Sequence, residues 1–175
     1  MIKFIFHKIF GWKIIGYTKL PEKCVLIAGP HTHWIDLFLG IAIRNSVGED
    51  IKFIGKEELF FFPFNIIMNF LGGIPVSRNS KTNTVDQISN LIKSKNEFKL
   101  AISPEGTRKK VNKWKSGFYY IAKKSNIPVI CISLNFKKRI VTFFKPYFLT
   151  DNIDKDMEKL KINFKDSIGK IPEYS

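Results

Sequence analysis

Short continuous apolar runs alternate along this chain with segments of helical periodicity. Residues 24–30 and 128–136 are apolar runs closed by glycine, proline or polar residues, as buried parallel strands are. Residues 84–95 place Val85, Ile88 and Ile92 on one face of a predicted helix. Strands that alternate with helices predict an α/β fold, in which a single layered domain has a largely parallel central sheet flanked by helices.

The same patterns predict one domain over residues 1–175, without repeats or linkers. We expect an N-terminal helix and a short strand in residues 1–20, the core in residues 21–150 and a C-terminal helix in residues 151–175. Further strands are predicted at residues 51–55, 72–76, 99–104 and 139–149, and further helices at residues 36–44, 60–70, 116–125 and 153–168.

Two of the predicted helices carry enough apolar surface to contact a membrane. Residues 1–10 form a short basic amphipathic pattern, which fits a helix lying in a membrane interface and equally a helix packed on the domain. Residues 60–70 are apolar nearly all round and contain Pro63, so this helix is expected to be buried or to face lipid. No stretch reaches the roughly 18 to 20 apolar residues of a membrane span. No cleavage site follows the first helix, so we expect no signal peptide.

The net charge of the chain limits which kinds of partner it is expected to bind. A formal net charge of +14 attracts polyanions in general, including anionic lipid headgroups and phosphorylated substrates. A nucleic-acid-binding module interleaves basic residues with aromatics on one face. Here the lysines are scattered and most phenylalanines fall inside apolar runs, so no nucleic acid partner is expected.

Cys24 and Cys131 lie within apolar runs and predict buried, reduced thiols, which fits a cytoplasmic compartment.

Candidate chemistry gathers where predicted strands end, which is the edge where open α/β sheets place their sites. His31 follows the strand at residues 24–30, and Asp36 begins the next helix. If the loop folds back, the Asp36 carboxylate can accept a hydrogen bond from one imidazole nitrogen and orient the other as a general base. Imidazole titrates near neutrality, so His31 can remove a proton from a hydroxyl. A helix-capping Asp36 beside a structural histidine is the alternative.

His33 gives the same segment a second interpretation. His-x-His near Asp36 resembles a metal-ligand cluster, and a metal-dependent hydrolase using His31, His33 and Asp36 is the alternative function. Only His7 remains among the histidines, and no further group of ligands is evident. We therefore expect no metal, and we expect His33 to line or cap the site.

Two basic segments also follow predicted strands. Glu105, Gly106, Thr107 and Arg108 together offer backbone amides, a hydroxyl and a guanidinium, a combination that suits a phosphate. Glu105 fits such a site only if it bonds a hydroxyl or orients an arginine. Arg78 follows the strand at residues 72–76 and would, taken alone, be a surface residue.

In this order and spacing, the three segments resemble the glycerolipid (lysophospholipid, 1-acylglycerol-3-phosphate) acyltransferase superfamily over about residues 20 to 140. The match consists of the motifs His-x-x-x-x-Asp at His31 and Asp36, Gly-x-x-x-x-Arg at Gly73 to Arg78, and Phe-Pro-Glu-Gly-Thr-Arg at Pro104 to Arg108, together with a proline-bearing strand at residues 127–129, Lys56 and Gly117. Ser103 stands where the family's aromatic is frequent, and long N-terminal hydrophobic segments are lacking. The chain is similar to a compact bacterial-type subgroup.

The resemblance implies a glycerol-3-phosphate acyltransferase-like fold and an O-acyltransferase of phospholipid biosynthesis. His31, held by Asp36, would be the base that moves a fatty acyl group from acyl-CoA or acyl carrier protein to the hydroxyl of a lysophospholipid-like acceptor. Lys56, Arg78 and the loop from Glu105 to Arg108 would bind that substrate. The resemblance implies no cofactor, and peripheral membrane contact on the cytoplasmic side. A non-catalytic lipid-binding relative is a further alternative.

Overall fold

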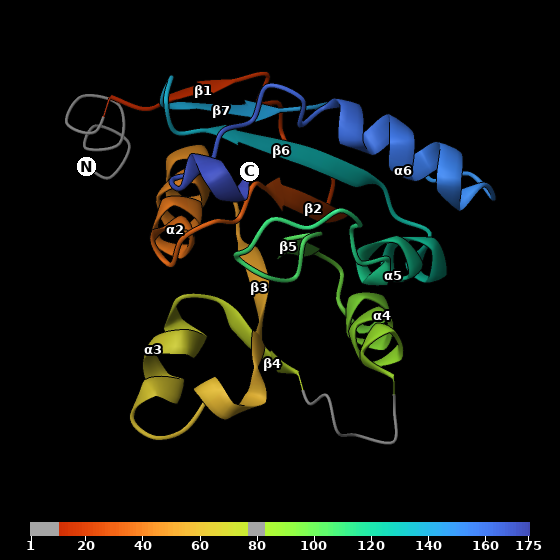
Figure 1. The fold of residues 1–175 in the computed structure, drawn as a ribbon. Helices are drawn as coiled ribbons and strands as arrows, with labels where there is room; N and C mark the ends of the chain where they lie inside the picture. The colour runs from red at the N-terminus through yellow and green to blue at the C-terminus, as the bar shows by residue number, and fades with distance from the viewer. Residues whose placement is uncertain (1–10, 77–82) are drawn as a thin grey trace.

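The computed structural model describes residues 11–76 and 83–175, and except for the Lys56 side chain it includes their side chains (Figure 1). Within these residues, seven strands form one sheet in the order β1-β7-β6-β2-β5-β3-β4. Neighbouring strands pair in parallel throughout, except for β6 and β7, which are antiparallel. The predicted α/β fold with a largely parallel sheet is therefore confirmed.

The elements follow the predicted order. The strands are β1 (Lys13–Ile15), β2 (Lys23–Gly29), β3 (Ile51–Lys56), β4 (Gly73–Val76), β5 (Phe98–Ile102), β6 (Val129–Asn135) and β7 (Ile140–Phe143). The helices are α2 (Ile35–Val47), α3 (Phe64–Phe70), α4 (Thr84–Ser94), α5 (Gly117–Ser125) and α6 (Ile153–Ile162), with short 3₁₀ turns η2 (Glu57–Leu59) and η3 (Pro172–Tyr174). The helix predicted at residues 1–10 lies outside the described residues.

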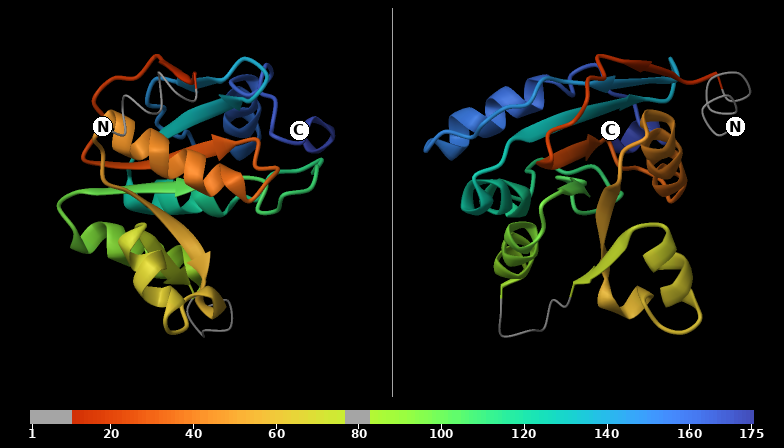
Figure 2. Two further views of the ribbon diagram at one scale, coloured as in Figure 1. Left: turned by 90° about the vertical axis from the view of Figure 1, so that its left-hand side faces the viewer. Right: turned by 180° about the vertical axis from the view of Figure 1, so that it is seen from behind.

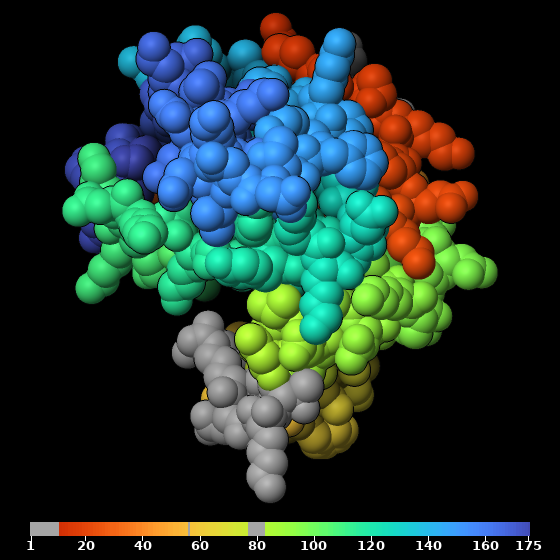
Figure 3. Space-filling model, turned by 90° about the vertical axis from the view of Figure 1, so that its right-hand side faces the viewer, coloured from red at the N-terminus to blue at the C-terminus, as the bar shows by residue number. Residues whose placement is uncertain are grey.

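Helices cover both faces of the sheet. Helix α2 packs on one face through Leu39 and Ile43, which belong to the same buried cluster as Leu26 of β2. Helices α4, α5 and α6 cover the other face. In Figure 1, α2 lies to the left of the sheet and these three helices lie to the right, and Figure 2 shows the same arrangement from two further directions. Figure 3 shows α6, α5 and α4 stacked over this second face. Because β2 and β6 are covered on both faces, nearly every residue in them is buried, which explains their uninterrupted apolar runs.

Two predicted elements end earlier than their patterns indicate. Strand β7 ends at Phe143, because Pro146 offers no amide hydrogen for a continued ladder, and Tyr147 forms a separate bridge with Val129. Helix α6 ends at Ile162, and Ile168 instead pairs with Asn135 at the end of β6. The apolar residues after Ile162 therefore serve this segment's contact with the sheet rather than a continued helix.

The apolar segment at residues 60–70 is the largest departure from its predicted packing. Its helix begins only after Pro63, since proline is tolerated before the first turn but not inside a helix. No residue of α3 is buried, so the buried alternative is wrong. The exposed large apolar side chains of this segment, together with that of Leu59 just before it, form what we call the α3 apolar patch: Leu59, Phe61, Phe62, Phe64, Ile66, Ile67 and Phe70. In the described part of the chain, no helix is both long enough and apolar enough to cross a bilayer.

The two cysteines lie within the core. Cys24 and Cys131 are both buried and free. Burial raises the pKa of Cys24 to about 12 and that of Cys131 to about 11. The prediction of buried, reduced thiols is confirmed, and neither sulfur is a thiolate near neutral pH.

Candidate active site

Two loops that follow neighbouring parallel strands meet at the carboxyl edge of the sheet. Strand β2 leads into His31, and its neighbour β5 leads into the loop at residues 103–108. The two loops are joined directly, because the backbone amide of His31 donates a hydrogen bond of 2.8 Å to Glu105 Oε2. Residues that are 74 positions apart in sequence therefore share one site.

The imidazole of His31 and the carboxylate of Asp36 form a close pair. His31 Nδ1 lies 3.0 Å from Asp36 Oδ2. The chain reverses between them, and the same oxygen accepts hydrogen bonds of 2.8 Å from the backbone amides of Thr32 and His33. The Asp36 side chain is only 5% exposed, whereas that of His31 is 29% exposed. The loop thus holds a buried carboxylate against a histidine that solvent or substrate can reach.

This geometry fixes which nitrogen of His31 is available for chemistry. Because Asp36 Oδ2 is a pure acceptor when ionised, its partner Nδ1 carries the proton in the neutral imidazole. The lone pair is then on Nε2, on the side of the ring away from Asp36. A histidine oriented by a carboxylate in this way can accept a proton from a hydroxyl and return it to a leaving group.

Glu105 contacts the backbone of His31 rather than an arginine or a hydroxyl of the described residues. Burial raises the pKa of Glu105, and the hydrogen bond from the His31 amide opposes that rise. Its carboxylate therefore fixes the position of the His31 backbone from the neighbouring strand. No sequence pattern within the loop indicates this contact, because it depends on the pairing of β2 with β5.

The rest of the loop faces outward. Gly106 has a φ of +65°, and an added Cβ there would overlap the side chain of Lys115. The Thr107 hydroxyl oxygen accepts a long hydrogen bond of 3.4 Å from the Lys109 amide. Arg108 is exposed. The loop offers a hydroxyl and a guanidinium at the edge of the site, and the glycine allows the tight turn that exposes them.

The contacts of His33 are with its own loop and not with a set of metal ligands. Its Nδ1 accepts a hydrogen bond of 3.2 Å from the Ile35 amide, and its ring centroid lies 5.4 Å from that of Trp34. Over residues 11–76 and 83–175, no group of three or more His, Cys, Asp or Glu side chains is placed to hold a metal ion. The donor arrangement therefore gives no support to a centre formed by His31, His33 and Asp36.

The structure does not describe the side chains of two predicted substrate-binding residues, Arg78 and Lys56. Arg78 lies outside the described residues. Lys56 is the last residue of β3, where its backbone pairs with Val76 of β4, but its side chain is likewise not described. Both strands end at the same edge as β2 and β5, and both roles stay predictions.

The C-terminal segment closes one side of the His31 loop, a feature that the sequence did not indicate. The Ile171 amide donates a hydrogen bond of 3.1 Å to Thr32 Oγ1. A Cβ at Gly169 would overlap the Thr32 side chain, so the two segments are in close contact. Phe164 lies against Gly29, where a Cβ would be 3.5 Å from its ring. These contacts join residues at opposite ends of the chain, so no local sequence signal could have revealed them.

Comparison with known proteins agrees with this architecture. The sequence model of the Acyltransferase family matches residues 12–135, which is more than half of the chain. Comparison with proteins of curated function gives no significant match. Among solved structures, the chain is similar to the 1-acyl-sn-glycerophosphate (LPA) acyltransferase PlsC from Thermotoga maritima, with a TM-score of 0.67 and 19% sequence identity over 94% of this chain and 75% of that one. With its fold shared and its sequence matched from β1 to the end of β6, this chain belongs to the Acyltransferase family.

Proposed function

We propose that this acyltransferase moves a fatty acyl group from a thioester to the hydroxyl of a lysophospholipid-like acceptor, with His31 as the general base. The observation that carries the proposal is the 3.0 Å contact between His31 Nδ1 and a buried Asp36 oxygen that two backbone amides also hold. A lysophosphatidate-like acceptor is supported by the motif resemblance and by the fold shared with the Thermotoga maritima enzyme.

The reaction proceeds through proton transfer at His31. Nε2 takes the proton of the acceptor hydroxyl as its oxygen attacks the thioester carbonyl. The tetrahedral intermediate then collapses, the carbon–sulfur bond breaks, and the imidazolium returns its proton to the departing sulfur. Asp36 stabilises the imidazolium that forms between these steps. Every proton is accounted for by His31 and the two substrates, so the proposed step requires no metal or cofactor.

The acceptor is positioned by the basic groups that follow β4 and β5. Arg78 and Arg108 each offer a guanidinium to the acceptor phosphate, and Thr107 offers a hydroxyl. Gly106 allows the turn that presents Thr107 and Arg108. Lys56 adds a cation at the end of β3. Glu105 acts as a positioning residue through the His31 amide. Fixing the phosphate places the hydroxyl near the base and lowers the entropic barrier.

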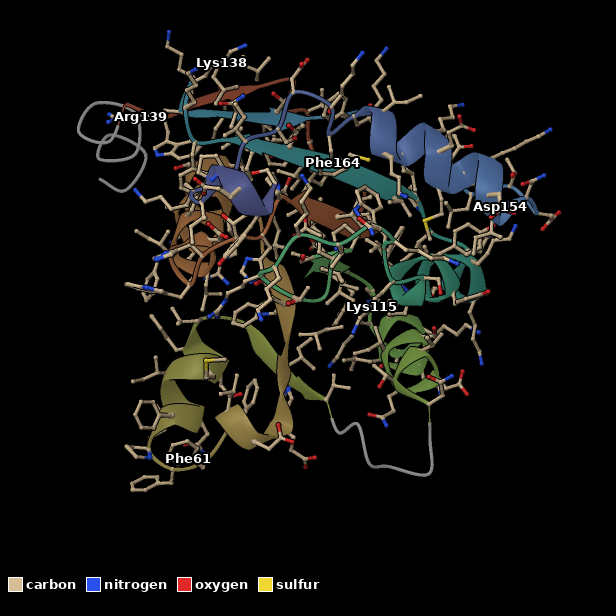
Figure 4. The ribbon with its side chains drawn as sticks, viewed as in Figure 1. Phe61, Lys115, Lys138, Arg139, Asp154 and Phe164 are labelled. Atoms are coloured by element: carbon tan, nitrogen blue, oxygen red, sulfur yellow. The ribbon has the colours of Figure 1, made fainter. Side chains whose placement is uncertain are left out.

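The enzyme works at a membrane surface, on the cytoplasmic side, as a peripheral protein. The α3 apolar patch supports this, since monomeric soluble proteins rarely expose so many large apolar side chains together. Figure 4 shows the Phe61 ring projecting outward at the end of the lobe formed by η2, α3 and the ends of β3 and β4. Clustered apolar side chains of this kind insert into the interface between headgroups and acyl chains.

Thiol release tests the chemistry. We would measure free thiol from palmitoyl-CoA and from palmitoylated acyl carrier protein, each with a panel of lysolipid acceptors, for wild type, His31→Ala and His33→Ala. We expect acceptor-dependent release that falls by about 10² to 10⁴ in His31→Ala. His33→Ala is the matched control, because it removes the neighbouring imidazole and leaves the Asp36 contact to His31 in place.

Three outcomes would count against the proposal. Equal activity in wild type and His31→Ala would remove His31 as the base. An equal loss in both variants would point to a role shared by the two histidines, as in the metal-dependent alternative. Lysolipid binding without thiol release from any donor would indicate the non-catalytic lipid-binding alternative.

A further inference from the structure

A concavity lies at the same edge of the sheet as His31. It is a groove of about 790 Å³. Its walls include Trp12 before β1, Phe136 after β6, Ile35 in the first turn of α2, and four residues of the C-terminal segment, Ile168, Gly169, Lys170 and Pro172. Because Ile35 directly precedes Asp36, the groove begins beside the loop that holds the base.

The charged residues among the described lining of the groove are all basic. Its ionisable lining residues are Lys137, Arg139 and Lys170, and none of the described residues that line it is acidic. Arg139 belongs to the turn between β6 and β7, at the upper left of Figure 4, where its neighbour Lys138 is also labelled. Three cations around one concavity favour a ligand that carries several negative charges.

The groove also has an apolar floor. The rings of Trp12 and Phe136 pack edge to face with centroids 5.0 Å apart, and Ile35 and Ile168 line the groove beside them. An inorganic anion would leave this apolar surface unused. The ligand that fits carries phosphates at one end and less polar groups along its length.

We propose that this groove binds the phosphate-bearing end of a coenzyme A thioester and directs the thioester toward His31. The inference rests on the proposed acyl transfer, which needs a donor beside the base. The C-terminal segment that lines the groove is hydrogen-bonded to the His31 loop, since the amide of Ile171, between the lining residues Lys170 and Pro172, donates to Thr32 Oγ1. The three cations of the groove are residues other than Arg78 and Arg108, so we assign the donor and acceptor phosphates to different basic groups.

Equilibrium titration of coenzyme A tests this without turnover. We would compare wild type, the double variant Lys137→Glu/Lys170→Glu and the single variant Lys138→Glu at low ionic strength. Arg139 stays unchanged, because its φ of +52° and its packing against Gly11 give it a structural role. We expect the double variant to bind coenzyme A about tenfold or more weakly, and Lys138→Glu to bind within about twofold of wild type.

Lys138 is a matched control, because it lies in the same turn and is exposed but does not line the groove. Pantetheine, which lacks the phosphates, should bind wild type and the double variant equally. Equal weakening in Lys138→Glu would overturn the proposal, since the effect would then be general surface charge. No binding of coenzyme A to wild type would overturn it as well. Binding of holo acyl carrier protein through the same lysines, with none of coenzyme A, would assign the groove to a different occupant.

The same measurements separate this inference from the proposed function. Palmitoyl-CoA binding to His31→Ala that depends on Lys137 and Lys170 would support the groove even if no acyl transfer is found with any acceptor. Acyl transfer from palmitoyl-CoA that is unaffected by the double variant would overturn the groove and leave the proposed reaction standing.

Discussion

A single carboxylate oxygen organises the His31 loop. Asp36 Oδ2 lies within hydrogen-bond distance of His31 Nδ1 and of the amides of Thr32 and His33. The two amides hold the carboxylate in place, and the carboxylate in turn holds the ring. Loop conformation and ring orientation therefore depend on the same atom.

Replacing that carboxylate should separate catalysis from folding. Asp36→Asn keeps one oxygen for the backbone amides but loses the charge that stabilises an imidazolium. We expect kcat to fall by about 10² to 10⁴, with a cooperative thermal unfolding transition retained. Thiol release and circular dichroism would measure the two effects. Activity within about twofold of wild type would show that His31 does not need the carboxylate.

Glu105 predicts a pH dependence of stability. Its pKa is raised from the ordinary value of 4.5 because burial disfavours the charged carboxylate. Since the folded state binds the proton more tightly, its contribution to stability is complete below pH 4.5 and is lost as the pH rises through the higher folded-state pKa.

Glu105→Gln tests this sign, because the amide has no proton to lose and its oxygen can still accept from the His31 amide. Urea unfolding at pH 4 and pH 7 would give the free energies of unfolding. We expect the variant to gain stability relative to wild type on going from the lower to the higher pH. An unchanged difference between the two proteins at both pH values would contradict the burial argument.

Helix α3 consists mostly of apolar residues, and yet none of them is buried. Its pattern is apolar nearly all round, which predicts burial in protein or in lipid but does not choose between them. The structure leaves Phe62 and Phe70 78% and 85% exposed. The periodicity of a sequence indicates which faces of a helix are apolar. Only the tertiary fold shows that, among the described residues, no other element covers those of α3.

Substituting these phenylalanines should weaken membrane binding without destabilising the fold. Burying one such ring is worth about 1.5–3 kcal/mol, so Phe62→Ser and Phe70→Ser should each reduce vesicle binding roughly tenfold or more. Vesicle flotation measures the binding. Phe148→Ser is the control, because Phe148 is 62% exposed but lies outside α3, next to the residue that pairs with Val129. Equal losses in all three variants would remove α3 as the contact.

For the whole molecule, the net charge of +14 adds a long-range attraction to anionic surfaces. Each basic residue near an anionic leaflet contributes about 1 kcal/mol, and salt screens this attraction over a Debye length. We expect binding to vesicles with anionic lipid to fall as salt rises, toward the weaker, salt-independent binding to neutral vesicles. Flotation at low and high salt measures both. Salt-independent binding of equal strength to both kinds of vesicle would show that the apolar patch acts alone.

The sequence by itself determined the α/β class and the order of the elements, and it indicated that His31 can meet Asp36 if the loop between them folds back. These follow from short-range rules, because strand runs, helical periodicity and a five-residue loop require no distant partner. Only the tertiary structure decided that Glu105 contacts the His31 amide, that Ile171 bonds Thr32, and that the rest of residues 11–76 and 83–175 leaves α3 exposed. Each of these depends on which strands pair and where distant segments pack, and the free energy of such contacts is not encoded in any local pattern.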